Sequence, residues 1–186
     1  WIEKSDYSRL SSQDEIFCAD LVNLITDANK KLQPIVLGSI LNATATLNHH
    51  FDGERLIGKK NKEQLIETAL MYLNAPYLWG GKTPFGIDCS GFTQMVYRLN
   101  GLKLMRDASE QSKQGDALSF IEESSPGDLA FFDNKEGAII HVGIIMENNH
   151  IIHAHGKVRI DLLDHTGIYN VDHRIHSHNL RVIKSI

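Results

Sequence analysis

The chain changes its hydrophobic period near Pro126-Gly127, and this change limits the folds available to it. Before this point, apolar residues recur at helical spacing over about 61–74 and 89–100. After it, β-branched and aromatic residues typical of strands dominate the segments DLAFF, AIIHVGIIM, HIIHAHG, KVRIDLL and NLRVIKSI. Because helices precede strands instead of alternating with them, the sequence predicts an α+β fold with an antiparallel sheet.

Punctuating residues set the ends of the predicted helices. Pro76 ends the first, since a residue that precedes proline is pushed out of the α region. Asn100-Gly101 is a C-cap signal for the second. Asp107 and Glu110 form a capping signature that predicts a further short helix.

The N-terminal third follows a different pattern. The segment SSQDE reads as a capping box before apolar residues at helical spacing, which predicts a helix over about 13–31. Cys18 would lie inside this helix as a small packing residue. Residues 33–58 contain short β-branched runs cut by Pro, Gly and Asp-Gly, which predict strands and hairpin turns. The charged connector KKNK marks a domain boundary.

Composition excludes several classes of partner. The formal net charge of −4 gives no electrostatic footprint for nucleic acid. No apolar run approaches the roughly 20 residues of a membrane-spanning helix, so we expect no membrane span. The chain begins at Trp1, so any targeting signal would lie upstream. Two cysteines without a C-x-x-C pair form neither a disulfide framework nor a redox motif.

Cys89 stands between Asp88 and Ser90 at the start of a predicted helix, after a Gly-rich loop. Unpaired N–H groups and the helix dipole stabilise a thiolate at such a position, and a nearby histidine would stabilise it further. A packing thiol can also occupy a helix start. This feature alone leaves both interpretations open.

The histidines favour the nucleophile. His141 interrupts a strand of Ile, Val and Met, and His153 and His155 follow on the next strand. A nucleophile, a base and a group that orients the base form a catalytic triad. A two-residue turn between the strands would place His141 and His153 on opposite faces, so the triad predicts a longer turn or a bulge. His155 competes with His153 for the third position.

The other histidines are expected in solvated loops: His49, His50, His165, His173, His176 and His178. A zinc site made of His141, His153 and His155 is the alternative to the triad. It ranks lower because it has no clearly placed acidic base and leaves the segment DCSGF unexplained. We therefore expect neither a metal nor another cofactor.

Six motifs occur in a characteristic order between about 60 and 186: PYLWGG, DCSGF, RDAS, PGDL, HVGI and IHA. In order and spacing they resemble the NlpC/P60 family. The resemblance implies a papain-like α+β catalytic domain, with N-terminal helices packed on an antiparallel sheet. It also implies cysteine-peptidase activity on peptidoglycan peptides.

The resemblance assigns catalytic roles to four residues. Cys89 would be the nucleophile, His141 the general base and His153 the third polar residue, while Tyr77 would assist at the oxyanion. For the substrate, the resemblance implies that Asp88 and Ser90 hold a free N-terminal amine. Asp88 also stands at the N-cap position of the predicted helix, so one carboxylate oxygen would cap the helix while the other faces the ligand. Two further candidates for the substrate-binding set are Ser109 and Trp79.

The subgroup with bacterial SH3-like modules is the most similar. Its members cut the bond between γ-D-Glu and L-Lys or meso-diaminopimelate in peptides with a free N-terminal L-Ala. By this resemblance, residues 1–58 would be an SH3-like β-barrel region whose first module is mostly missing, and residues 59–186 the catalytic domain. A monomer in the bacterial envelope, the periplasm or the medium is implied, or a cytoplasmic enzyme of muropeptide recycling. The alternatives are a thiol acyltransferase and a non-catalytic wall-binding protein.

Overall fold

The protein is described here by a computed structural model that covers residues 14–57 and 62–186. Three α-helices and two short 3-10 helices lie among thirteen strands in the described residues. The elements are β1 (Ile16–Cys18), β2 (Val22–Thr26), β3 (Leu32–Val36), β4 (Arg55–Ile57), η1 (Lys62–Gln64), α2 (Leu65–Leu70), β5 (Lys82–Thr83), β6 (Gly86–Ile87), α3 (Cys89–Leu99), α4 (Ala108–Gln111), β7 (Asp116–Leu118), η2 (Ile121–Glu123), β8 (Leu129–Asp133), β9 (Ile139–Met146), β10 (His150–His155), β11 (Lys157–Leu163), β12 (Gly167–Asn170) and β13 (Ile175–Ser185).

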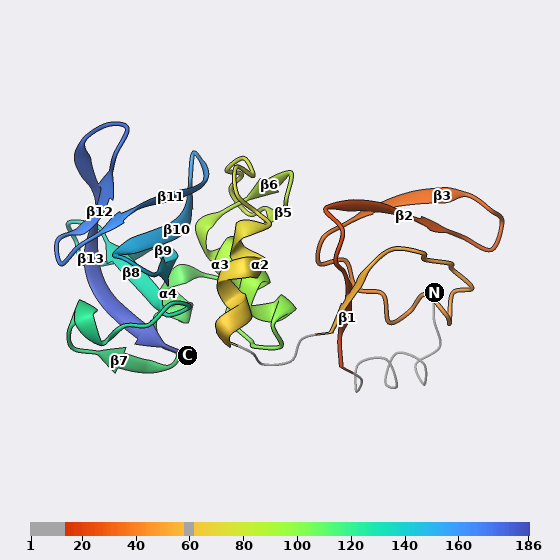
Figure 1. The fold of residues 1–186 in the computed structure, drawn as a ribbon, viewed down its shortest axis with the longest axis horizontal. Coiled ribbons are helices and arrows are strands. Elements are labelled where there is room, and N and C mark those ends of the chain that lie inside the picture. The colour runs from red at the N-terminus through yellow and green to blue at the C-terminus, as the bar shows by residue number, and fades with distance from the viewer. Residues whose placement is uncertain (1–13, 58–61) are drawn as a thin grey trace.

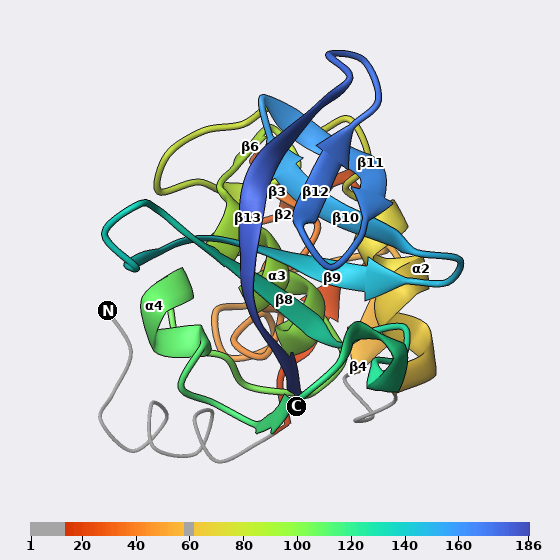
Figure 2. The ribbon, with the colours of Figure 1, turned by 90° about the vertical axis from the view of Figure 1, so that its left-hand side faces the viewer.

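A closed antiparallel sheet forms the C-terminal half. The strand order is β12-β11-β10-β9-β8-β13-β7, and an additional pairing of β12 with β13 joins the two sides into a barrel. Figure 2 shows β13 crossing the front of this barrel beside β8 and β12. The antiparallel sheet and the α+β order of elements are thereby confirmed. β7 and β12 were not predicted.

Side chains alternate between the two faces of the barrel strands, as the pleat requires. The inner face holds a compact apolar cluster of Ala130, Phe132, Ile145, Ile151, Leu163, Ile168 and Ile183. The outer face turns the neighbouring residues Phe131, Val142, Ile144, Ile152 and Val158 toward the helices. Because both faces are buried, these strands read as continuous apolar runs in the sequence.

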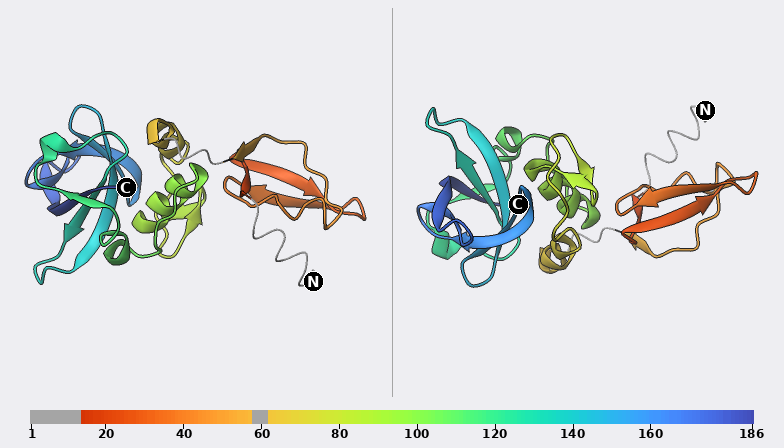
Figure 3. Two further views of the ribbon diagram at one scale, coloured as in Figure 1. Left: turned by 90° about the horizontal axis from the view of Figure 1, so that it is seen from below. Right: turned by 90° about the horizontal axis from the view of Figure 1, so that it is seen from above.

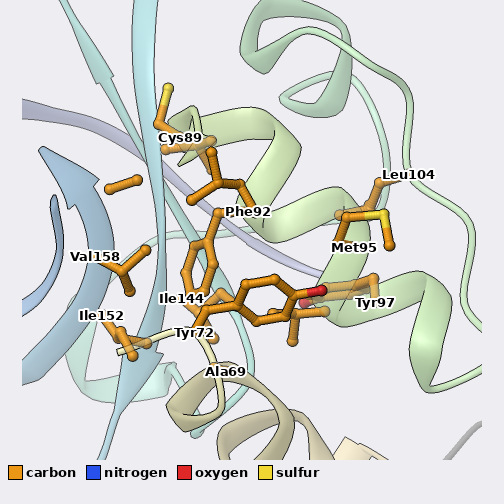
Figure 4. Packing of buried hydrophobic residues seen from close by; sticks show 14 of the residues in the cluster. Ala69, Tyr72, Cys89, Phe92, Met95, Tyr97, Leu104, Ile144, Ile152 and Val158 are labelled. Atoms are coloured by element: carbon orange, nitrogen blue, oxygen red, sulfur yellow. The ribbon is translucent and has the colours of Figure 1, made fainter. Parts of the chain in front are cut away.

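α3 occupies the centre of the molecule, between the barrel and the N-terminal strands (Figures 1 and 3). Phe92, Val96 and Leu99 recur at three- and four-residue spacing and are almost completely buried, which confirms the predicted helix. Phe92 packs edge-to-face on Tyr72 with ring centroids 6.0 Å apart (Figure 4). α4 confirms the predicted short helix.

The first predicted helix is shorter than 61–74. Its α-helical part is α2, preceded by the 3-10 turn η1 and followed by hydrogen-bonded turns up to Ala75. Asn74 adopts a left-handed backbone with φ of 68°, which ends the helical path two residues before Pro76.

The N-terminal unit, residues 14–57, is wholly β and turn. β1 pairs with β4, and β2 pairs with β3, both antiparallel. A small core forms from Cys18, Ile25, Leu41 and Phe51. The predicted packing role of Cys18 is confirmed, since this side chain is fully buried.

The predicted helix over 13–31 is wrong. Its apolar residues do not share one buried face: Phe17 is 1% exposed, whereas Leu21 is 50% and Leu24 45% exposed. Asp27 accepts hydrogen bonds from the N–H groups of Asn29 and Lys31, at 2.8 and 2.9 Å, and turns the chain between β2 and β3. Such local bonds compete with a helix.

Of the predicted capping box, only Glu15 lies in the described residues. Glu15 pairs with Arg98 of α3. Ser12, the capping residue of that box, lies outside the described residues, as does the rest of the segment 1–13.

The turn between β9 and β10 is longer than two residues, as the predicted triad requires. Met146 pairs with His150, so Glu147, Asn148 and Asn149 form a three-residue connection. Both asparagines adopt left-handed backbones, with φ of 56° and 58°. This confirms the prediction of a longer turn, because it places His141 and His153 on the same face of the sheet.

Gly143 pairs with His153 across this register, and a Cβ added there would lie 2.9 Å from the Cβ of His153. We expect Gly143→Ala to lower the free energy of unfolding by about 1–3 kcal/mol, because the overpacked strand must shift. Chemical denaturation would measure it. As a control, Gly137→Asn lies in open space in the β8–β9 turn at a φ that Asn tolerates, and should change stability by less than about 1 kcal/mol. Equal stability of Gly143→Ala and the parent would contradict this close packing.

Candidate active site

Cys89 is the first residue of α3, and Asp88 is its N-cap. The carboxylate of Asp88 accepts a hydrogen bond of 2.6 Å from the N–H of Gly91, which confirms the predicted capping role. Cys89 is 7% exposed. In Figure 4 its sulfur points away from the packed side chains of the core, at the end of the helix. The helix thus presents the thiol at the edge of the core.

The Cys89 thiol is protonated at neutral pH in the free protein. Burial raises its pKa, and the charge of Asp88 raises it further. Hydrogen bonds from the backbone N–H groups of Val142 and Ser90 act in the opposite direction but do not reverse the shift. The helix N-terminus therefore does not produce a resting thiolate here, and Cys89 requires a base to be deprotonated.

His141 on β9 is the neighbouring side chain that could act as this base. Its ring is 5% exposed, and burial, together with the neighbouring imidazoles, lowers its pKa well below the usual value. His141 is therefore neutral at pH 7 and able to accept a proton. Its Nε2 lies 2.8 Å from Nδ1 of His153, which leaves Nδ1 of His141 as the ring nitrogen available to the thiol.

The structure separates the two candidates for the third position. His153 is fully buried and hydrogen-bonds His141. His155 is exposed, and its ring centroid lies 6.4 Å from that of His141. The geometry thus places His153, and not His155, behind the base.

Two residues near the histidines were not predicted. His178 on β13 stacks on His141, with ring centroids 4.1 Å apart, so its expected place in a solvated loop is wrong. Asp161 on β11 is 1% exposed, and its Oδ2 lies 3.1 Å from Nε2 of His153. His178 lies 37 residues beyond His141, and only the barrel pairing brings them together; Asp161 was detectable as a charge inside the apolar strand KVRIDLL.

Asp88 is engaged through both oxygens. Oδ1 receives the N–H of Gly91, and Oδ2 receives that of Gly80 at 2.7 Å. Arg106 binds the same carboxylate in a bidentate pair, at 3.1 and 2.6 Å, and also donates to Ser90 at 3.0 Å. Burial alone would raise the pKa of Asp88, but these hydrogen bonds lower it overall.

This pairing corrects one expectation. Asp88 was expected to cap with one oxygen and to face a ligand with the other. In the structure a ligand ammonium must share the second oxygen with Arg106 and Gly80.

Two adjoining cavities meet at Cys89, Tyr77 and Ile140. The first, of about 600 Å³, is lined by all four predicted substrate-binding residues, Trp79, Asp88, Ser90 and Ser109, and by Arg106, which was not predicted. The second, of about 350 Å³, is lined by His141, His155, Gly156 and His178. Trp79 is 84% exposed at the rim of the first cavity. The thiol therefore lies where an extended ligand would pass from one cavity to the other.

Comparison with known proteins identifies the family. The sequence profile of the NlpC/P60 family matches residues 74–177, which include Cys89, His141 and His153. The chain belongs to the NlpC/P60 family.

Named relatives cover part of this NlpC/P60 protein. It is 40% identical over 98 residues to the gamma-D-glutamyl-L-lysine dipeptidyl-peptidase of Bacillus subtilis, covering 52% of this chain and 33% of the relative. It is 37% identical over 106 residues to dipeptidyl-peptidase 6 of Lysinibacillus sphaericus, covering 55% of this chain and 37% of the relative. The chain therefore spans about a third of the length of these relatives.

A solved structure extends the likeness to the N-terminal unit. The NlpC/P60 family protein of Bacillus cereus superposes with a TM-score of 0.74 at 19% identity, covering 98% of this chain and 66% of that one. The NlpC/P60 domain of the peptidoglycan hydrolase SagA superposes with a TM-score of 0.54 at 28% identity, covering 68% of this chain and 99% of the domain. Both establish the family fold.

Two further features of the described residues bear on the earlier expectations. None of their helices is long and apolar enough to cross a membrane. Within residues 14–57 and 62–186, there is no group of three or more His, Cys, Asp or Glu side chains that could hold a metal ion.

The buried histidines predict how stability depends on pH. The pKa values of His141 and His153 are lowered, and burial and neighbouring imidazoles lower that of His178 from 6.5 to about 4. Between pH 6.5 and 4 the unfolded chain binds more protons than the folded one, so stability falls as pH falls. We expect the free energy of unfolding to drop by at least about 1 kcal/mol per pH unit across this window.

Urea denaturation at several pH values would measure this slope. His178→Phe should reduce it, whereas His173→Asn, at an exposed position, should leave it unchanged. A slope of zero between pH 6.5 and 5, where carboxylates contribute little, would show that these histidines are not held neutral.

Proposed function

We propose that this protein is a cysteine endopeptidase of peptidoglycan peptides. Its target would be the bond between γ-D-Glu and the diamino acid, L-Lys or meso-diaminopimelate, in peptides with a free N-terminal L-Ala. The observation that carries the proposal is the position of Cys89 on a helix N-terminus, in one cavity with a neutral His141 that His153 holds from behind. The name of the Bacillus subtilis relative, gamma-D-glutamyl-L-lysine dipeptidyl-peptidase, which matches over 52% of this chain, supports the choice of bond.

The chemistry follows from the protonation states. Nδ1 of His141 takes the thiol proton as Sγ of Cys89 attacks the γ-carbonyl carbon, and the C–S bond forms. When the tetrahedral intermediate collapses, the C–N bond breaks and the imidazolium gives its proton to the leaving amine. Water, deprotonated by His141, then hydrolyses the thioester and restores the thiol.

Tyr77 is the proposed donor to the oxyanion. It lines both cavities beside Cys89, and burial, followed by the nearby Cys89 and Asp88, raises its pKa, so that its hydroxyl keeps its proton. We place this hydroxyl as a hydrogen-bond donor to the substrate oxygen on which negative charge develops.

The two cavities suggest how the peptide lies. We place the L-Ala-γ-D-Glu part in the larger cavity, where Asp88 and Ser90 receive the ammonium and Ser109 and Trp79 line the wall. The diamino acid then occupies the smaller cavity beside His155. The ammonium would compete with Arg106 for Asp88, so its binding requires the guanidinium to yield part of its pairing.

The N-terminal unit enters the proposal as a substrate-binding accessory. We retain residues 1–58 as an SH3-like region and 59–186 as the catalytic domain. The unit is joined to the catalytic part by the pair of Glu15 with Arg98 and by the packing of Phe17 into the main core. A monomer acting on the wall outside the cytoplasm, or on recycled fragments inside it, fits the proposed substrate.

Hydrolysis of L-Ala-γ-D-Glu-L-Lys, free and N-acetylated, tests the proposal. We expect the free peptide to be cut between Glu and Lys, and Cys89→Ala to lower kcat/KM by at least about 10³-fold. Acetylation should lower kcat/KM by roughly 10- to 100-fold, because hydrogen bonds to charged groups contribute about 1.5–3 kcal/mol. Mass spectrometry of the products identifies the bond.

The possible outcomes separate the alternatives. Equal cleavage of both peptides would remove the amine-binding role of Asp88 and Ser90. Activity that survives in Cys89→Ala would exclude the thiol mechanism. A new amide product in the presence of added amine, without hydrolysis, would make the protein an acyltransferase.

A further inference from the structure

The buried carboxylate of Asp161 is the last member of a hydrogen-bonded series that begins with His141 and continues through His153. Asp161 lies on β11, and its Oδ2 is 3.1 Å from Nε2 of His153. Arg159, two residues earlier on the same face, donates to both oxygens of Asp161, at 2.7 and 2.8 Å. Asp172, which is exposed, accepts from the outer side of the same guanidinium at 2.8 Å.

The carboxylate is ionised at neutral pH. Burial alone would raise the pKa of Asp161, but hydrogen bonds from His153 and Arg159 lower it overall. An ionised carboxylate can only accept hydrogen bonds. The nitrogen that faces it, Nε2 of His153, therefore carries the proton.

This proton fixes the tautomer of the next ring. His153 is neutral, because burial lowers its pKa more than Asp161 raises it. With its one proton on Nε2, Nδ1 is an acceptor, and the 2.8 Å contact requires a donor on His141. Nε2 of His141 is thus protonated, and Nδ1 carries the lone pair.

We infer that Asp161 is a positioning residue that directs the two imidazole protons away from Cys89 and so makes Nδ1 of His141 the base. The role in peptide cleavage rests on the proposed function; the tautomer does not. The opposite arrangement would set the lone pair of His153 Nε2 against the carboxylate at 3.1 Å, which electrostatic repulsion disfavours. Arg159 keeps the carboxylate in place through its bidentate pair.

Replacing the carboxylate of Asp161 by an amide removes the constraint on where the two imidazole protons lie. The side chain of Asp161→Asn has nearly the same shape but can donate to Nε2 of His153. His153 can then carry its proton on Nδ1 and donate to Nε2 of His141, which moves the proton of His141 to Nδ1. In that state His141 cannot take the proton of the Cys89 thiol.

Activity of the variants gives the first test. We expect Asp161→Asn to lower kcat for L-Ala-γ-D-Glu-L-Lys by about 10²- to 10⁴-fold with KM changed by less than about threefold, the loss typical of a misdirected tautomer. Asp172→Asn is the matched control, since it removes a carboxylate from the same arginine without a contact to the histidines. It should keep the parent activity within about twofold.

The proton itself gives the second test. ¹⁵N NMR of the histidine rings distinguishes protonated from unprotonated nitrogens. We expect Nδ1 of His141 to be unprotonated in the parent and partly or wholly protonated in Asp161→Asn. If Asp161→Asn fails to fold, the parent spectrum alone decides: a proton on Nδ1 of His141 overturns the inference.

Alkylation of Cys89 by iodoacetamide, followed by mass spectrometry, separates this inference from the proposed function. The reaction needs a base but no peptide. If the parent does not cut the peptide, yet its Cys89 reacts at least about tenfold faster than that of Asp161→Asn, the inference stands and the proposed substrate fails. If the parent and Asp161→Asn cut the peptide and react with iodoacetamide equally well, the inference is overturned and the function stands.

Discussion

The register between β9 and β10 is the constraint on which the rest of the site depends. A strand places alternate side chains on opposite faces, so a connection shorter by one residue would turn either His141 or His153 away from the other. The left-handed Asn148 and Asn149 allow the three-residue connection that brings both rings to one face. The contacts of His141 with His153 and of His153 with Asp161 both use this face of the sheet.

Closure of the barrel places a third histidine beside His141. β13 pairs with β8 and β12, and it brings His178 into a stacked contact with His141. Burial, together with the neighbouring imidazoles, lowers the pKa of His141 and keeps its ring neutral. The fold thus produces a protonated thiol beside an uncharged base, whereas a helix N-terminus considered by itself favours a thiolate.

The parts of the site that could be predicted from the sequence are those that depend on local patterns. Cys89, Asp88 and the helix behind them follow from capping and 3.6-residue periodicity, which act within a few residues. The pairing of His141 with His153 also follows, because the two strands are joined by a short turn. His178 was missed because its neighbours are decided by pairings between strands distant in sequence. Arg106 was missed as the partner of Asp88 because a loop carries it back to the helix start.

In the N-terminal unit a local pattern led to a wrong prediction, the helix over 13–31. Apolar residues at helical spacing around Phe17 and Leu24 suggested a stripe, but helical spacing is a weak signal over so few turns. Val22, Ile25 and Thr26 are β-branched, and the Asp27 turn offers the backbone other partners. Tertiary pairing of β1 with β4 then decided the structure.

A protonated thiol that is 7% exposed also affects the chemical durability of the protein. Peroxides attack thiolates, and a cysteine held permanently in that form is lost stepwise to sulfenic, sulfinic and sulfonic acids. In the proposed mechanism the sulfur acquires nucleophilic character only while His141 holds its proton. The burial that raises the pKa of Cys89 therefore keeps the sulfur in the thiol form, which oxidants attack more slowly than the thiolate.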